Sequence, residues 1–600
     1  MELLQEIKEK IDNFHISDYY FYLNKIKKEI DISSLKKVKI AVLRSYTAEM
    51  LEPFLRVLLL LEGYDLEIRF GGFNQYPQEI LDLQSWLYKF EPDFVILMTR
   101  IEDILPDFID NFDLINEADW EQKLAAKSKE FANLFDLAGK NLNTNIIVQN
   151  TFLNKAFWGI YDSQMKSSQH NLIHKYNQKL AEIAQERPFT FIWNFAGFLS
   201  REGYDNIFDP KIWYLSRNPF SKSAYMKMAK ELKSYIMSIL GKVKKCIVLD
   251  LDNTLWGGIA GEDGLEGIQL GYDYPGNCYL QFQKELLKLN KRGIVLAINS
   301  KNNENDALNI IENHPYMVLK KENFATMQIN WTDKATNLHK IINTLNIGAD
   351  SVIFIDDNPV ECELVKENFP QCCVIKIPDK PFLIPEIINK LPDIETIKLT
   401  NEDKNKSQMY QAQSQRKNLE VSAVSLEDFL YKLEMKVQIE PMSNFSLPRI
   451  AQLTQKTNQF NTTLKRYTDK DILDISQDCQ NFIFSVACTD KFGDNGIIGV
   501  IILKTQNKTC FIDTFLLSCR VIGRTIEESM IAFIVKLAQK KCMENIIGKI
   551  TRHSRNKMVH DIYSKFNFTK ITDDEFSIDI KDYQIEYSPF TKVVHDGVIT

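Results

Sequence analysis

The sequence predicts a multidomain α/β protein. Its 600 residues are too many for one hydrophobic core, and at about 100–200 residues per domain we expect three or four domains. Short apolar runs alternate with helical patterns along most of the chain, which indicates sheets covered by helices. With 44% hydrophobic and 26% charged residues, the composition excludes a collagen-like, disordered or disulfide-scaffold chain.

Charge and hydropathy narrow the expected partners and location. There are 73 Lys and Arg residues against 80 Asp and Glu, a net charge of -7, so nucleic acid is not expected as the main partner. No apolar run approaches the roughly 18–20 residues that span a bilayer, and residues 1–18 lack the apolar core of a signal peptide. The ten cysteines form no Cys-x-x-Cys pair. We therefore expect a cytoplasmic protein without a membrane contact.

The amino-terminal part is expected to be helical and then to become an α/β sandwich. Within residues 1–36, Leu3, Leu4, Ile7 and Ile11 recur at helical spacing. From residue 37 to 235 the sequence pattern changes to short apolar runs, expected to be buried strands, separated by helical stretches. The expected strands are KIAVL, DLEIRF, DFVILM and NIIVQN.

Three further segments follow in order. Residues 236–392 form a second α/β block, with the strands CIVLDL, IVLAINS and SVIFIDD. Residues 393–433 are polar with a helical pattern and are expected to be a linker helix. Residues 434–600 mix strands with a helix after Arg524, which indicates an α+β domain. Its expected strands include NFIFSVA, GIIGVIIL and TCFIDTFLL.

Acidic side chains follow the strands of the middle block. One route of phosphoryl transfer uses an attacking carboxylate, a second carboxylate that protonates the leaving oxygen, and cations that neutralise the phosphate. Carboxylates at strand ends are also the hard oxygen ligands that suit Mg²⁺. The residues available at strand ends and one helix start are Asp250, Asp252, Ser300, Lys334, Asp356 and Asp357.

These residues resemble the motifs of the haloacid-dehalogenase (HAD) superfamily of aspartyl phosphotransferases. The strings VLDLDNTLWGGIAGEDG, SKNN, INWTDK and FIDDNPVE are similar to a narrower group, the FkbH-like proteins. The resemblance implies a HAD-like Rossmannoid core without a large cap domain. It also implies these roles: Asp250 as nucleophile, Asp252 as acid/base, Asp250, Asp252, Asp356 and Asp357 around Mg²⁺, and Thr254, Ser300, Lys301, Lys334 and Asn358 around the phosphate.

The carboxy-terminal block resembles the same group through QLTQKTNQFN, DKFGDNGIIGV and DTFLLSCRVIGRTIEE. The last string also looks like the acyl-CoA-binding turn of GNAT acetyltransferases, where helix-start amides hold a pyrophosphate. Arg520, Gly523 and Arg524 are then candidate phosphate ligands, although Thr525 replaces the usual small residue. Cys519, beside Arg520, is the candidate acyl-carrying nucleophile, and the alternative for this thiol is a small core residue.

The amino-terminal α/β block loosely resembles SGNH hydrolases. Ser45, Gly71 to Gly72 and Asn150 follow its strands as those motifs do. An active enzyme of that type also needs a histidine late in the domain, and Asp209 and Trp213 stand in that region instead. We expect a degenerate SGNH-like domain that serves as a docking surface.

The resemblance to FkbH-like proteins implies a glyceryl transferase and phosphatase. Its substrate would be 1,3-bisphosphoglycerate, and its partner the phosphopantetheine arm of an acyl carrier protein in natural-product biosynthesis, such as polyketide assembly. Two alternatives stay open from the residues alone. One is a Mg²⁺-dependent small-molecule phosphatase with inert flanking domains, and the other is a non-enzymatic scaffold.

Overall fold

The structure is a computed structural model of the chain. It describes residues 3, 6–7, 11, 14–391, 393–397, 409, 412, 415–416, 419–420, 422–553, 556–595 and 598–599. The predicted linker of residues 393–433 lies partly outside the described residues, and its described end, helix α21 (Leu426–Leu433), packs into the core of the carboxy-terminal domain. Contacts divide the chain into two compact units, residues 1–237 and 238–600. Across the described residues, no helix is both long enough and apolar enough to cross a membrane.

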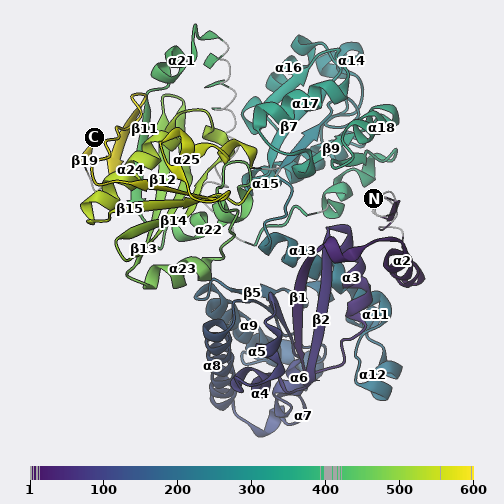
Figure 1. The fold of residues 1–600 in the computed structure, drawn as a ribbon. Coiled ribbons are helices and arrows are strands. Elements are labelled where there is room, and N and C mark those ends of the chain that lie inside the picture. Colours follow the sequence, from purple (N-terminus) through teal and green to yellow (C-terminus); the bar gives the residue numbers. More distant parts are fainter. Residues whose placement is uncertain are drawn as a thin grey trace. The chain divides into compact units, whose positions relative to one another are not determined.

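The first unit contains a five-stranded parallel sheet in the order β2-β1-β3-β4-β5. Helices α8 and α9 cover one face, where they pack on alternate residues of β1, β3 and β4 (Figure 1). The four expected strands are β1 to β4. The strands are β1 (Lys36–Arg44), β2 (Tyr64–Phe73), β3 (Phe94–Met98), β4 (Asn145–Gln149) and β5 (Thr190–Trp193). The helices are α2 (Ile16–Glu29), α3 (Leu51–Leu61), α4 (Tyr76–Leu81), α5 (Trp86–Phe90), α6 (Ile101–Ile104), α7 (Asp107–Asp110), α8 (Glu117–Asn141), α9 (Gln169–Gln185), α10 (Phe195–Glu202), α11 (Tyr204–Ile207), α12 (Pro210–Ser216) and α13 (Lys222–Ile239).

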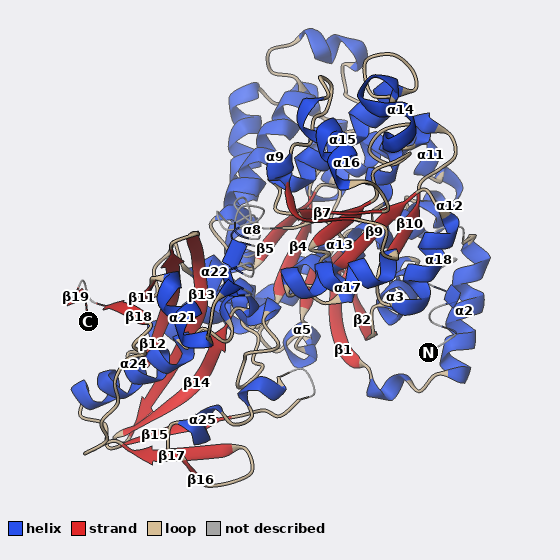
Figure 2. Ribbon diagram, turned by 90° about the horizontal axis from the view of Figure 1, so that it is seen from above, coloured by secondary structure: helices blue, strands red, loops and turns tan. Residues whose placement is uncertain are grey.

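The second unit begins with another five-stranded parallel sheet, in the order β10-β9-β6-β7-β8. Its strands β7, β9 and β10 are labelled in Figure 2. Alternate residues of each strand face opposite sides: Ile247 and Leu249 pack under α15 and α16, whereas Cys246 and Val248 pack under α17 and α18. The strands are β6 (Cys246–Leu249), β7 (Val295–Ser300), β8 (Phe324–Ile329), β9 (Val352–Asp356) and β10 (Cys373–Lys376). The helices are α14 (Ala260–Gly267), α15 (Gly276–Lys291), α16 (Glu304–Asn313), α17 (Lys334–Leu345) and α18 (Pro359–Asn368).

The rest of the second unit is built on a nine-stranded mixed sheet, in the order β16-β17-β15-β14-β13-β12-β11-β18-β19. Helices α22 and α23 cover one face and α24 and α25 the other. Only the pairs β14–β15 and β11–β18 are parallel. The strands are β11 (Met435–Pro441), β12 (Asn481–Asp490), β13 (Gly493–Gln506), β14 (Thr509–Leu517), β15 (Asn545–Lys549), β16 (Thr569–Lys570), β17 (Glu575–Asp579), β18 (Thr591–His595) and β19 (Val598–Ile599). The helices are α21 (Leu426–Leu433), α22 (Leu447–Lys456), α23 (Asp469–Gln477), α24 (Ile526–Lys540) and α25 (Ile562–Lys565).

These arrangements confirm the predicted fold class. Two all-parallel sheets with helices on their faces are α/β layers of the doubly wound type. The antiparallel run β11 to β14, followed by helix α24 and the parallel strand β15, is the α+β arrangement expected of a GNAT-like domain. In open parallel sheets, ligands bind outside the carboxyl ends of the strands, which directs attention to that edge of the second sheet.

Candidate active site

Strand order brings the predicted carboxylates together. Strand β6 ends at Leu249, and Asp250 follows, with its backbone N–H donating to Ile355 on β9 at 3.0 Å. Because β9 and β7 flank β6 in parallel, Asp356 at the end of β9 and Ser300 at the end of β7 lie at the same edge as Asp250. All three of these side chains are buried.

A buried lysine holds two of the carboxylates. Lys334 is the first residue of α17, a helix capped by the Asp333 side chain, which accepts from the N–H of Thr336. Its Nζ lies 3.0 Å from Oδ2 of Asp250 and 2.5 Å from Oδ2 of Asp356. Lys334 is only 3% exposed, so this ion-pair network is shielded from solvent.

The site carries more negative charge than Lys334 balances. Burial, and then repulsion from Asp250, raises the pKa of Asp356 to about 7 and also raises the pKa of Asp357. Burial lowers the pKa of Lys334, but Asp250 and Asp356 more than offset this and the net pKa is raised. A further cation would relieve this repulsion.

Mg²⁺ fits this donor set. Carboxylate oxygens of Asp250, Asp356 and Asp357 all lie within 4.8 Å of one another. Oδ1 of Asp250 is buried and has no hydrogen-bond partner among the described residues. Hard oxygen ligands of this number, with room left for water and a phosphate oxygen, are those that Mg²⁺ prefers.

Asp252 occupies a different position from the other carboxylates. Its Oδ1 accepts from Nε1 of Trp256 at 2.9 Å and from the N–H of Ala260 at 3.0 Å, and its Oδ2 accepts from Asn302 at 2.9 Å. The Asp252 carboxylate is not in the group that could hold a metal. Burial raises the pKa of Asp252 against the effect of these donors, as suits a group that delivers a proton.

The predicted phosphate ligands divide into two groups. Thr254 and Ser300 are both buried, and Oγ1 of Thr254 has no partner among the described residues. Lys301 and Asn358 have other contacts. Nζ of Lys301 pairs with Glu361 at 2.6 Å, and Oδ1 of Asn358 caps α18 by accepting from Val360.

Two residues that hold Asp252 were not predicted. Trp256 is fully buried and Asn302 is 4% exposed. Both lie inside strings that indicated the site: Trp256 in VLDLDNTLWGG, four residues after Asp252, and Asn302 in SKNN, fifty residues after it. For Trp256, the available signal was a tryptophan four residues after the predicted acid/base. For Asn302, sequence spacing alone gives no reason to pair it with Asp252.

The carboxy-terminal turn has the shape that the sequence suggested. Strand β14 ends at Leu517, Cys519 begins a short 3₁₀ turn, and α24 begins at Ile526. Gly523 has φ +80° and Thr525 has φ +58°, so both take left-handed conformations before the helix. Cys519 is half-buried, and no described residue makes a hydrogen bond to its Sγ.

The two arginines of this turn are engaged by protein groups. Arg520 is buried and donates to Sδ of Met409 and to Oγ of Ser518. Arg524 is also buried, pairs with Asp490 and donates to the carbonyl of Arg520. Burial and then the neighbouring Arg416 lower the pKa of Arg524 to about 10.

A segment of the chain lies along the open edge of β14. Strands β14 and β15 pair only from Thr509 to Ile512, and beyond that the residues 460–463 take the place of β15. The N–H of Thr462 donates to Phe515 at 3.1 Å, and the N–H of Leu517 donates to Phe460 at 2.9 Å. The string QFNTT, whose first part resembled the FkbH-like group, therefore fills the gap between the two diverging strands.

Ser45 of the first unit has no catalytic histidine beside it among the described residues. Its side chain is fully buried, and Oγ donates to Asp103 at 2.8 Å and accepts from the N–H of Arg100 at 3.1 Å. Asp209 caps α12, and the Trp213 ring packs against the guanidinium of Arg100 at 4.3 Å. These contacts are those of a structural hydroxyl.

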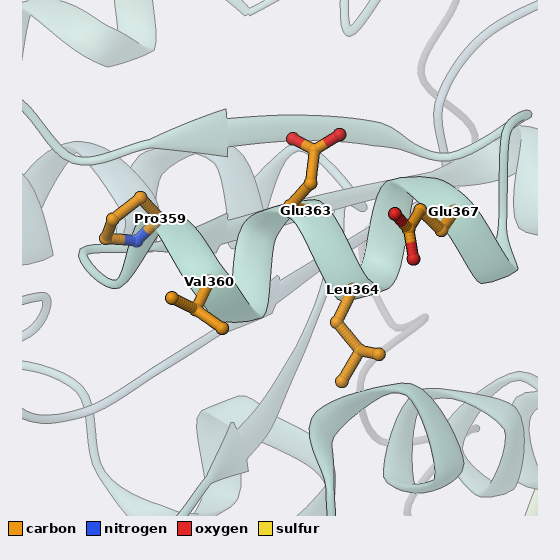
Figure 3. A pocket seen from close by; sticks show the side chains of 5 residues that line it. All are labelled: Pro359, Val360, Glu363, Leu364 and Glu367. Atoms are coloured by element: carbon orange, nitrogen blue, oxygen red, sulfur yellow. The ribbon is translucent and has the colours of Figure 1, made fainter.

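A hollow along α18 is lined by Pro359, Val360, Glu363, Leu364 and Glu367 (Figure 3). None of these five residues belongs to the carboxylate group. The hollow therefore lies on the helix that follows Asp356 but contributes no residue to the carboxylate site.

Comparisons with known proteins agree with this geometry. Residues 39–237 match the family described as FkbH, N-terminal domain, and residues 245–374 match the family described as NLI interacting factor-like phosphatase. A search of curated proteins gave no match. The crystal structure of the N-terminal part of the protein BF1531 from Bacteroides fragilis, containing a phosphatase domain complexed with Mg, is 32% identical with a TM-score of 0.57, over 64% of this chain and 100% of that one.

Acetyltransferases match a smaller part of the chain. The ribosomal-protein-S18-alanine N-acetyltransferase from Escherichia coli is 10% identical with a TM-score of 0.20, over 25% of this chain and 96% of that one. The GNAT-like assignment of residues 434–600 rests on the strand order of the domain itself.

The parallel sheet, the carboxylates at its edge and the buried lysine define a HAD-type phosphohydrolase site that uses Mg²⁺. The chain is therefore an enzyme of the phosphohydrolase and transferase class. It belongs to the FkbH-like family of HAD proteins.

Proposed function

We propose that this enzyme takes 1,3-bisphosphoglycerate, removes phosphate and loads the glyceryl unit as a thioester onto an acyl carrier protein for natural-product biosynthesis. The observation that supports this most is the buried cluster of Asp250, Lys334 and Asp356. Membership of the FkbH-like family supports the carrier protein as partner.

The ester phosphate is removed at Asp250. A carboxylate oxygen of Asp250 attacks phosphorus, the bond from phosphorus to the substrate oxygen breaks, and Asp252 gives that oxygen its proton. Water then attacks the aspartyl phosphate, and Asp252 accepts the proton of this water. Lys334 balances charge on the phosphate and orients Asp250. Bound Mg²⁺, held by Asp250, Asp356 and Asp357, supplies further charge neutralisation.

The acyl phosphate at the other end of the substrate is already activated. The thiolate of Cys519 attacks its carbonyl carbon, inorganic phosphate leaves, and a thioester forms without ATP. The phosphopantetheine thiol of the carrier then takes the acyl group, which returns the Cys519 thiolate. Exchange of one thioester for another needs positioning more than driving force. The backbone of the turn around Gly523 would face the phosphate of the arm, while the side chains of Arg520 and Arg524 hold the turn through Ser518 and Asp490.

We also propose the division of labour along the chain. Residues 37–235 are a degenerate SGNH-like docking domain, residues 236–392 the phosphotransferase and residues 434–600 the acyltransferase. A cytoplasmic location is proposed with it.

Intact-protein mass spectrometry tests the proposal. The enzyme is incubated with 1,3-bisphosphoglycerate and Mg²⁺, with and without carrier protein, and the masses of both proteins are measured. We expect a glyceryl or phosphoglyceryl adduct that is absent in Cys519→Ser and stays phosphorylated in Asp250→Asn. Cys542→Ser, at an exposed thiol, is the matched control.

Two other outcomes of this experiment would contradict different parts of the proposal. A normal adduct on Cys519→Ser would place the acyl-carrying thiol elsewhere. Phosphate release without any acyl-enzyme or loaded carrier would indicate a Mg²⁺-dependent phosphatase with inert flanking domains.

A further inference from the structure

An ion pair crosses the catalytic edge of the second sheet. Lys301 follows Ser300, the last residue of β7, and Glu361 lies in the first turn of α18, the helix that follows β9. Nζ of Lys301 lies 2.6 Å from Oε1 of Glu361. Because β6 lies between β7 and β9, this pair spans the carboxyl end of β6, where Asp250 stands.

The two partners are exposed to different degrees. The side chain of Lys301 is 36% exposed, whereas that of Glu361 is 10% exposed. Oε2 of Glu361 is buried and has no partner among the described residues. A lysine ammonium has three donor positions, and Glu361 takes one of them. Glu361 therefore holds one side of the ammonium, and the other side faces solvent at the mouth of the site.

The position of Lys301 at the same sheet edge as Asp250 suits a short substrate. Neighbouring strands lie about 4.8 Å apart, so a group above the end of β6 is within reach of a three-carbon chain attached to a phosphate at Asp250. The phosphate itself has Lys334, which is buried against Asp250. Lys301 is partly neutralised by Glu361 and is placed for an oxygen further along the substrate.

We propose that Lys301, positioned by Glu361, determines substrate specificity by binding a carboxyl-level oxygen of the phosphate ester. The substrate class is then a phosphate monoester of a short hydroxy acid, free or as its thioester. This inference rests on the proposed function, which supplies the phosphorylated acyl chain. A site built to donate to that oxygen disfavours analogues that lack it.

Isothermal titration calorimetry in the inactive Asp250→Asn background tests this without turnover. The ligands are 3-phosphoglycerate, which carries a carboxylate, and glycerol 3-phosphate, which has the same three-carbon chain without it, both with Mg²⁺ present. We expect 3-phosphoglycerate to bind at least about tenfold more tightly. Lys301→Met should remove this preference, and Lys301→Arg should keep most of it.

Two further variants separate positioning from structure. Glu361→Gln keeps the size of the side chain but no longer holds the ammonium of Lys301 by charge. We expect it to weaken the binding of 3-phosphoglycerate more than that of glycerol 3-phosphate, so that the preference for 3-phosphoglycerate falls about threefold. Lys366→Met is the matched control, because Lys366 pairs with Glu363 on the same helix at 3.4 Å and should leave the preference unchanged.

The result that overturns the inference is an equal loss of affinity for both ligands in Lys301→Met, which would make Lys301 a general phosphate ligand, or no loss for either. Carrier loading is measured separately by mass. If loading fails while the preference depends on Lys301, the proposed function is wrong and the specificity role stands.

Discussion

The ammonium of Lys334 lies 3.0 Å from Oδ2 of Asp250, with both side chains buried at the carboxyl edge of a parallel sheet. A buried ion pair of this kind fixes the orientation of the attacking carboxylate. Its free oxygen, Oδ1, has no hydrogen-bond partner among the described residues. The pair therefore leaves one oxygen of Asp250 for phosphorus or for the metal.

Removal of the nucleophile should abolish phosphate release. Asp250→Asn keeps the size of the side chain but cannot form the aspartyl phosphate, so we expect hydrolysis of p-nitrophenyl phosphate with Mg²⁺ to fall at least about 10³-fold. Asp273→Asn, at an exposed position, is the control and should be near normal. Near-normal turnover of Asp250→Asn would show that the HAD chemistry is misassigned.

Removal of the buried lysine should destabilise the fold. Lys334→Met leaves Asp250 and Asp356 buried without their cation, which we expect to cost about 3 kcal/mol of unfolding free energy in metal-free buffer. Urea denaturation measures this. The double variant Lys334→Met, Asp356→Asn should recover part of the loss, because it removes one of the two uncompensated charges. A double variant whose loss of unfolding free energy equals the sum of the losses in Lys334→Met and Asp356→Asn would contradict a direct coupling between these residues.

Mg²⁺ should stabilise the protein more at alkaline than at acidic pH. The pKa of Asp356 is raised from 3.8 to about 7, so between these values the folded state holds a proton that the unfolded state has lost. For this group, the stability of the metal-free protein falls as pH rises through that window. Mg²⁺ needs the carboxylate and competes with the proton.

The measurement is the melting temperature with Mg²⁺ and with EDTA, at about pH 5 and about pH 8. The increase from Mg²⁺ should be larger at the higher pH, and phosphatase activity should vanish with EDTA. An equal increase at both values, or activity that persists in excess chelator, would be inconsistent with a metal at Asp250, Asp356 and Asp357.

The amino-terminal serine should be dispensable for chemistry. Ser45→Ala removes a buried hydroxyl that donates to Asp103, so we expect a loss of about 1 kcal/mol in stability and largely unchanged glyceryl transfer. Asp103→Asn is a useful companion, because it keeps the contact but removes the charge. Complete loss of transfer in folded Ser45→Ala would reveal a catalytic role for this domain.

Local patterns were sufficient for the strands and for the main catalytic candidates. The runs CIVLDL, IVLAINS and SVIFIDD predicted β6, β7 and β9, because continuous apolar stretches bounded by polar residues are typical of strands buried on both faces. Asp250 and Asp356 stood at the ends of such runs. The chemistry of carboxylates and a lysine in that order was enough to predict the class of site.

Tertiary structure alone decided which of these side chains meet and what each one contacts. Lys301 and Asn358 stand in the right strings, yet one pairs with Glu361 and the other caps α18. Trp256 and Asn302 converge on Asp252 from different segments. Strand order sets these partners: β6 lies between β7 and β9 through crossover connections, so residues far apart in the chain become neighbours at one sheet edge, and periodicity along a single segment carries no information about that order.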